Sequence, residues 1–136
     1  MNPMAGNPFA QYQAAQLETS PPERILIMLF DAAIRFAGQA RQAMVEKRHE
    51  EAHKNCVRVQ NILTELMVTL RFDVGGDIAK NLFDLYEFLH HTTVQANIRK
   101  EPGQIDVVTG HLKDLREAWS QAAKNVASQR TRTATA

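Results

Sequence analysis

The chain has little of what several common protein classes require. Cys56 is the only cysteine among 136 residues, so no internal disulfide can form and packing alone must stabilise the fold. The formal net charge of +1 gives no strong field of one sign, which disfavours a nucleic-acid partner. No apolar run approaches the roughly 20 residues that a membrane-spanning helix needs. Residues 1–15 have neither the basic start nor the apolar stretch of a secretory signal peptide. We therefore expect a cytosolic protein without membrane insertion.

What remains is the composition of one ordinary globular domain. Hydrophobic residues make up 44% and charged residues 23%, which excludes global disorder. Residues 1–19 contain Pro3, Pro8 and Gly6 among several Asn and Gln residues and predict a flexible arm, with Phe9 and Tyr12 as an isolated aromatic pair. Residues 20–127 carry the periodic pattern of a folded domain. Residues 128–136, which combine Arg with Ser, Thr and Ala, predict a disordered tail.

Four stretches show the apolar spacing of amphipathic helices. The first begins at Ser20-Pro21-Pro22-Glu23, where Ser suits the N-cap, Pro the first turn and Glu the capping box. In each stretch apolar residues recur every three or four positions and so line one face of a helix. The four seams are Leu26, Leu29, Ala33, Phe36, Ala40 and Ala43; Ala52, Cys56, Val59, Leu63, Leu66 and Leu70; Ile78, Leu82, Leu85, Leu89, Thr92 and Ala96; and Ile105, Val108, Leu112, Leu115, Trp119, Ala122 and Val126.

Short breaks separate the four predicted helices. Polar residues 46–51 interrupt the first two seams, Gly75-Gly76 predicts a turn that Asp77 can cap, and Glu101-Pro102-Gly103 precedes the last helix. Connections this short favour antiparallel neighbours. No segment alternates apolar and polar residues with the period of two that indicates a strand. The predicted fold is all-α, an antiparallel up-down four-helix bundle with an extended N-terminal arm.

The helices carry more apolar side chains than a four-helix core needs. On a helical wheel Val57 and Phe83 fall on the outer flank of their seams, with Met67 and Tyr86 beside them. Adjacent helices are therefore predicted to expose an apolar groove that a partner fills. The alternative is a broadly packed bundle with no external ligand, because isolated exposed apolar side chains are common.

Two histidine spacings raise the question of a metal or catalytic site. Glu50 with His53 and Glu87 with His90 have the Glu-x-x-His spacing of di-iron bundles. The seams place both glutamates on outer faces, whereas metal ligands must point inward. His111 lacks the surroundings of a phosphotransfer histidine, and neither a paired nucleophile nor a phosphate-binding loop accompanies the histidines. We expect no metal, no cofactor and no enzymatic activity.

Short motifs from Asn7 to about Gln121 carry a family resemblance. They are Asn7-Pro8-Phe9, Tyr12-Gln13, Ser20-Pro21-Pro22-Glu23, Leu29 to Phe36, Asn55, Ile62, Glu65-Leu66, Gly75 to Ala79, Asn81-Leu82, Leu85-Tyr86, Ala96-Asn97 and Leu115 to Trp119. Each is short, but their order and spacing together are specific. On these residues the chain resembles the FliS family, the bacterial flagellin secretion chaperones. It departs from the family pattern at Phe9 and Phe30, where Tyr is more common, and at Ala32, where Gly is.

The resemblance implies an export chaperone. It implies that the bundle binds the C-terminal segment of flagellin, which is disordered in the monomer, prevents premature polymerisation and aids delivery to the flagellar type III export apparatus. The residues expected to contact flagellin lie on the second and third helices and combine apolar side chains with asparagines that can bond to a client backbone. They are Asn55, Val57, Val59, Ile62, Leu66, Asn81, Leu82, Phe83, Leu85, Tyr86 and Asn97.

The resemblance also implies that the N-terminal arm lies over a groove when no client is present. Phe9 and Tyr12 are its expected anchors, which makes the arm an intramolecular competitor of the client. Beyond flagellin and the export apparatus we expect at most a weak homo-oligomer. The alternative function is a helical-bundle adaptor or signalling domain that binds a different amphipathic partner.

Overall fold

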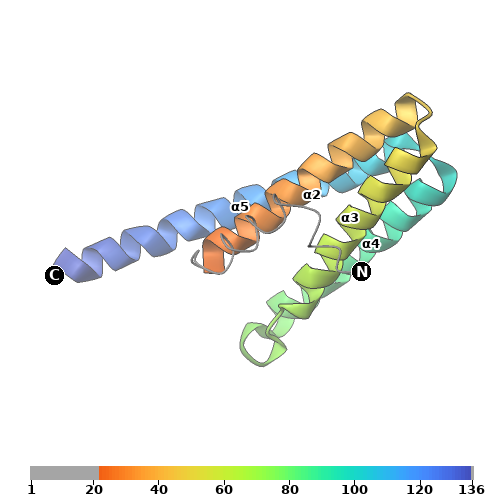
Figure 1. The fold of residues 1–136 in the computed structure, drawn as a ribbon. Coiled ribbons are helices and arrows are strands. Elements are labelled where there is room, and N and C mark those ends of the chain that lie inside the picture. The colour runs from red at the N-terminus through yellow and green to blue at the C-terminus, as the bar shows by residue number, and fades with distance from the viewer. Residues whose placement is uncertain (1–21, 136) are drawn as a thin grey trace, which may run out of the picture.

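The computed structural model describes residues 22–135, which form four helices and their connections. At residues 22, 126, 127, 130 and 132–135 the description covers the backbone only. The helices are α2 (Pro22–Val45), α3 (His49–Val68), α4 (Phe72–Arg99) and α5 (Pro102–Thr135). Both α2 and α4 pack against α3 and α5, and consecutive helices run antiparallel (Figure 1). The prediction of an all-α up-down four-helix bundle is confirmed. The arm, residues 1–19, and the helix start predicted at Ser20 lie outside the described residues.

Small side chains on α2 let its neighbours pack closely. Ala33, Ala37, Ala40 and Ala43 are fully buried, and larger side chains of the other helices fill the space opposite them. Burying each large apolar side chain stabilises the fold by about 1.5–3 kcal/mol relative to leaving it in water. The buried cluster draws on all four helices: Phe30, Ala33, Ala37, Ala40, Ala43, Met44, Ala52, Cys56, Val59, Leu63, Leu66, Tyr86, Leu89, Ala96, Ile105, Val108 and Leu112.

The core face of α4 differs from the predicted seam at two positions. Thr93 is buried in place of Thr92, and Ala79 is buried while Ile78 is exposed. Ala79 and Thr93 lie two heptads apart, which keeps them on one face of the helix. The Thr93 hydroxyl donates to the Leu89 carbonyl at 2.8 Å, so its burial leaves no unpaired polar group. The assignment of Ile78 and Thr92 to the seam was therefore wrong.

Two helix ends also differ from expectation. α3 ends at Val68 and α4 already begins at Phe72, with a break at Gly76, whose φ of 51° and ψ of −124° are non-helical. The turn expected at the two glycines is thus a kink near the start of α4. Glycine suits this position, because a residue with a side chain would be strained at such a positive φ. α5 continues to Thr135, where a disordered tail was expected from residue 128. No Pro or Gly after Gly110 interrupts this helix.

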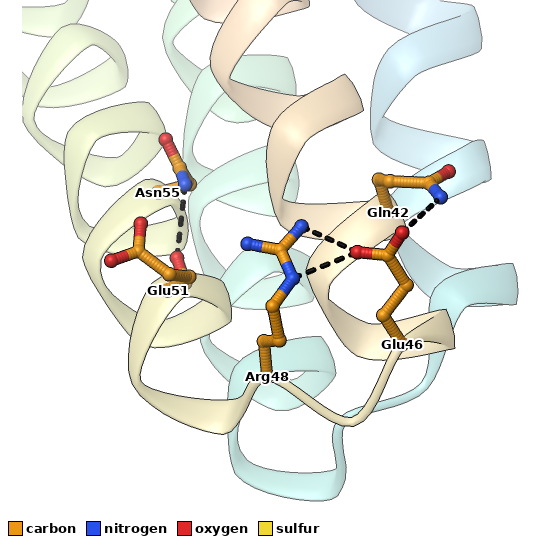
Figure 2. A network of polar contacts seen from close by, with 5 residues as sticks. All are labelled: Gln42, Glu46, Arg48, Glu51 and Asn55. Carbon is orange, nitrogen blue, oxygen red and sulfur yellow. Dashed lines mark hydrogen bonds and ion pairs between the residues drawn. The ribbon is translucent and has the colours of Figure 1, made fainter.

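A polar network fixes the connection between α2 and α3. Lys47 has a left-handed φ of 62°, and the Arg48 N–H donates to the Ala43 carbonyl at 2.8 Å. Figure 2 shows the Glu46 carboxylate accepting hydrogen bonds from Gln42, at 3.0 Å, and from Arg48, at 2.7 Å. These bonds, that of Gln42 above all, lower the pKa of the Glu46 carboxyl. These local bonds fix the path of the chain from the end of α2 into α3.

At the other end the two helix pairs separate. α2 and α5 continue side by side, while the tip of the α3–α4 hairpin points away from them (Figure 1). α5 has 34 residues and α3 has 20, so α5 is longer by about 21 Å at a rise of 1.5 Å per residue. The last turns of α5 therefore extend beyond the reach of the other pair (Figure 1).

Candidate functional site

The separating helix pairs enclose a cavity of about 280 Å³ that opens to solvent, which we call the cleft. Its walls come from the start of α2, the end of α3, the first half of α4 and the middle of α5. A space of this size sits near the lower end of ordinary ligand pockets, about 300–1,000 Å³, and has room for bulky apolar side chains. The lining is almost entirely apolar: Leu26, Leu66, Thr69, Leu70, Arg71, Val74, Gly75, Ile78, Ala79, Leu82, Tyr86 and Trp119.

Aromatic side chains form the floor of the cleft. Tyr86 is only 1% exposed, and its ring lies 6.5 Å from that of Phe30 in the core. Burial raises the pKa of the Tyr86 hydroxyl, and a hydrogen bond with Trp119 opposes that rise. Tyr86 from α4 and Trp119 from α5 both line the cleft. Leu82 and Trp119 are half-buried, so they present apolar surface to whatever enters the cleft.

Two glycines shape the mouth of the cleft. A Cβ on Gly75 would lie 2.9 Å from the Cβ of Ala79, closer than two carbon atoms can approach. Gly76 adopts a φ of 51°, which sets the direction in which the first turn of α4 leaves the rest of the helix. Together they hold Val74 in the wall of the cleft.

The apolar surface continues from the cleft onto the tip of the α3–α4 hairpin. Val68, Phe72, Val74 and Ile78 are exposed there, by 51% at Phe72 and by up to 76% at Val74. The rings of Phe72 and Phe83 meet edge to face with their centroids 5.9 Å apart. Soluble proteins seldom leave a contiguous apolar surface uncovered unless it binds a partner. The tip and the cleft together therefore form one candidate binding surface.

The charged groups at the mouth of the cleft neutralise each other. Arg71 donates two hydrogen bonds to the Asp73 carboxylate, at 3.0 and 2.9 Å. This pairing raises the pKa of Arg71 and lowers the pKa of Asp73. Arg71 and Asp73 therefore add no net charge to the mouth of the cleft.

Some of the residues predicted to bind a client lie at this surface. Leu66, Leu82 and Tyr86 line the cleft, and Phe83 contacts Phe72 of the tip. Asn81 is exposed on α4, on the turn that contains Leu82. The structure thus brings these residues of α3 and α4 together at one end of the bundle.

Other predicted residues lie outside the cleft. Ile62 and Leu85 are half-buried against the core, Val57 is half-buried on α3, and Val59 is fully buried. In this structure Val59 has no surface with which to contact a partner.

Two of the predicted asparagines are engaged within the bundle. The Asn55 amide is buried and donates to the Glu51 carbonyl at 2.9 Å (Figure 2), while its oxygen accepts from Arg58 at 3.2 Å. Asn97 bonds to the His53 ring at 2.9 Å. Phe9 and Tyr12, the predicted arm anchors, lie outside the described residues.

Sequence reasoning missed part of the cleft lining. Leu26, Leu70 and Trp119 were assigned to helix seams, and they do pack against the core, but their free sides face the cleft. Two signals pointed to this surface. Residues 25–30 are six consecutive apolar residues, so they surround α2 and need cover on every side, and the glycine pair marks the kink beside Val74.

The described residues also bear on three other features: a metal site, a membrane-spanning helix and a reactive cysteine. Among the described residues no group of three or more His, Cys, Asp or Glu side chains is placed to hold a metal ion. The helices of residues 22–135 include none that is both long and apolar enough to cross a membrane. Burial raises the pKa of the Cys56 thiol to about 11, so this cysteine is a poor nucleophile at neutral pH.

The fold and the cleft define a class: a small helical bundle with an open apolar surface at one end. The profile of the family described as "Flagellar protein FliS" matches residues 5–126. The chain belongs to the FliS family, as the motifs predicted.

Curated relatives include the flagellar secretion chaperones FliS of several bacteria. The chain is 30% identical over 119 residues to that of Bacillus subtilis, which covers 88% of each chain. It is 32% identical to the FliS of Vibrio cholerae over 107 residues, which covers 79% of each chain. It is 30% identical to the FliS of Salmonella typhimurium over 115 residues, which covers 84% of this chain and 85% of the relative. The family assignment makes the protein a flagellar secretion chaperone and not an enzyme.

A solved structure has the same fold. The crystal structure of a bacterial flagellar chaperone superposes with a TM-score of 0.73 at 20% sequence identity, over 87% of this chain and 99% of the other. The four-helix arrangement is therefore shared although most side chains differ.

Proposed function

We propose that the chain binds the disordered C-terminal segment of flagellin in the cytosol, prevents its premature polymerisation and aids its delivery to the flagellar type III export apparatus. The observation that carries the proposal is the open apolar cleft that continues onto the exposed tip of α3 and α4. A segment that is disordered alone has apolar residues but no core in which to bury them. An amphipathic helix laid into the cleft hides those residues from other flagellin molecules.

Simple energetics support a helical segment as the occupant. Ordering a disordered segment costs about 2–5 kcal/mol. Each large apolar side chain that leaves water contributes about 1.5–3 kcal/mol, so a few well-buried contacts offset that cost. Leu82, Ile78 and Val74 offer partly exposed surface for such contacts, and Tyr86 with Trp119 provides a rigid floor. Asn81, exposed beside them, can bond to the client backbone.

The other predicted residues have different proposed roles. Val57, Ile62 and Leu85 are half-buried outside the cleft, where a client that extends beyond it can contact them. Asn55 and Val59 are buried, and we propose that they support the α3 surface from within. Asn97 lies at the opposite end of α4 and fits a client only if the segment runs the length of that helix.

Calorimetry with two forms of flagellin tests the proposal. One form is full-length and monomeric, and the other lacks about forty C-terminal residues, roughly 60 Å if helical. We expect the full-length protein to bind and the truncated protein to show no heat of binding. Equal binding of the two forms would place the client site elsewhere in flagellin, and the proposal would then fail.

We also propose that the N-terminal arm, residues 1–19, competes with the client through Phe9 and Tyr12. α2 begins at Pro22, and Leu26 in its second turn already lines the cleft, so the chain enters the bundle beside this site. Deleting residues 1–18 should then tighten client binding or promote self-association. Weaker binding with an unchanged oligomeric state would instead make the arm part of the client site.

A further inference from the structure

A second apolar surface lies on the outer side of α4 and α5. Phe88 and Val107 are 49% and 47% exposed, and the Phe88 ring meets the His111 ring edge to face at 6.0 Å. Val107 and His111 are four residues apart and so share one face of α5. Phe88 follows Tyr86 of the cleft floor by two residues, which turns it about 200° around the helix. The surface of Phe88, Val107 and His111, which we call the α4–α5 face, therefore points away from the cleft.

Two carboxylates flank this face at the same level. Asp84 lies one turn before Phe88 on α4, and Asp114 lies one turn after His111 on α5. α4 and α5 are antiparallel, so the step back from Phe88 to Asp84 and the step forward from His111 to Asp114 run in the same direction. Asp84 and Asp114 therefore lie on the same side of the contact between the two rings. Both carboxylates are exposed, and neither forms an ion pair with any side chain in the described part of the chain.

This combination of groups favours a cation. The face of an aromatic ring attracts a guanidinium, most strongly where the ring is partly desolvated. A carboxylate binds a guanidinium through short charge-assisted hydrogen bonds. An arginine that reaches over Phe88 stands about one helical turn from Asp84 and from Asp114. On α5, one turn from His111 and on the side opposite Asp114, Val107 offers apolar surface, and Gly110 leaves open space beside it.

We propose that the α4–α5 face docks a helix of a second protein, other than flagellin, that carries an arginine one turn from a bulky apolar residue. Complementarity with Asp84 and Asp114 sets the sign of the partner's charge. Since Phe88 and Tyr86 lie on opposite sides of α4, the chaperone can hold its client in the cleft and dock this protein simultaneously. The proposal rests on the proposed function only for the identity of the cleft occupant.

Two designed peptides test the docking chemistry. Both are alanine-based helices with leucine four residues from a charged residue, which is arginine in one and glutamate in the other. They are titrated into the ¹⁵N-labelled full chain. We expect the arginine peptide to shift the amide signals of Phe88, Val107 and His111 and to leave the Trp119 indole signal in place. The glutamate peptide should leave all of these signals in place.

A pair of double variants isolates the two carboxylates. Asp84→Asn with Asp114→Asn should weaken the arginine peptide by about 2- to 30-fold, as two exposed ion pairs are lost. Glu87→Gln with Glu117→Gln removes the same charge from exposed positions three residues further along the same two helices, and should weaken the peptide less. Equal effects of the two double variants, equal binding of both peptides, absence of binding, or a shift at Trp119 would each overturn the proposal.

Repeating the titration with flagellin already bound separates the two proposals. Undiminished binding of the arginine peptide supports simultaneous docking, and its displacement by flagellin overturns it. If flagellin itself fails to bind the chain, the proposed function fails, while the peptide result still decides the α4–α5 face.

Discussion

Replacing Ile78 by glutamate probes the cleft at a position that the fold does not need. Ile78 lines the cleft and is 72% exposed, so a glutamate there remains solvated in the free protein. Full burial of an isoleucine is worth about 1.5–3 kcal/mol, and the 72% still exposed corresponds to about 1–2 kcal/mol when a client covers it. That loss weakens binding by about 5- to 30-fold, and burying an unpaired carboxylate raises the expected loss above about 30-fold.

Ile98→Glu is the matched control. Ile98 lies on the same helix, is 70% exposed and does not line the cleft, so its replacement should leave client affinity unchanged. Calorimetry with the C-terminal segment of flagellin measures both variants, and circular dichroism shows that each remains helical. Equal weakening by the two variants, or full affinity of Ile78→Glu, would refute the assignment of the client to the cleft.

Two further predictions concern the bundle itself. Gly76→Ala should lower the free energy of unfolding by about 1–3 kcal/mol, because φ is 51° at this position. Gly110 lies in regular helix with equal open space, so Gly110→Ala should raise the free energy of unfolding by up to about 1 kcal/mol. Denaturant unfolding measures both variants, and equal changes would contradict the strain at Gly76. The Cys56 thiol, with a pKa raised by burial to about 11 from 9.0, should react with an alkylating reagent at pH 8 about 100-fold more slowly than a free thiol. Folding favours the protonated thiol, so the contribution of Cys56 to stability should be full below pH 9 and fall as pH rises toward 11. Alkylation of the native chain as fast as that of a free thiol would contradict the burial of Cys56.

The helices and their order follow from local signals in the sequence. Apolar spacing, the polar interval at residues 46–51 and the break before Pro102 each act within one or two turns, so they predict where helices form and that neighbours are antiparallel. The cleft depends on the angle between two helix pairs, which many residues set together. Leu26 and Trp119 illustrate the limit, because one side of each packs on the core and the other faces the cleft.

Tyr86 shows why the core face of α4 was misassigned. A tyrosine beside a leucine seam is typical of a flank, because its hydroxyl needs a polar partner. In the structure Tyr86 is buried and lines the cleft together with Trp119 of a different helix, and Thr93 is buried in place of Thr92. A contact between residues 33 positions apart in the chain leaves no periodic signal in either helix.

The fluorescence of Trp119 tests the central claim most directly. It is the only tryptophan in the chain, and it stands half-buried in the wall of the cleft. A tryptophan-free peptide of the C-terminal segment of flagellin should shift its emission to shorter wavelength and protect it from acrylamide, because the peptide removes water from the cleft. An unchanged emission and unchanged quenching, at a peptide concentration that calorimetry shows to be saturating, would contradict the cleft as the client site.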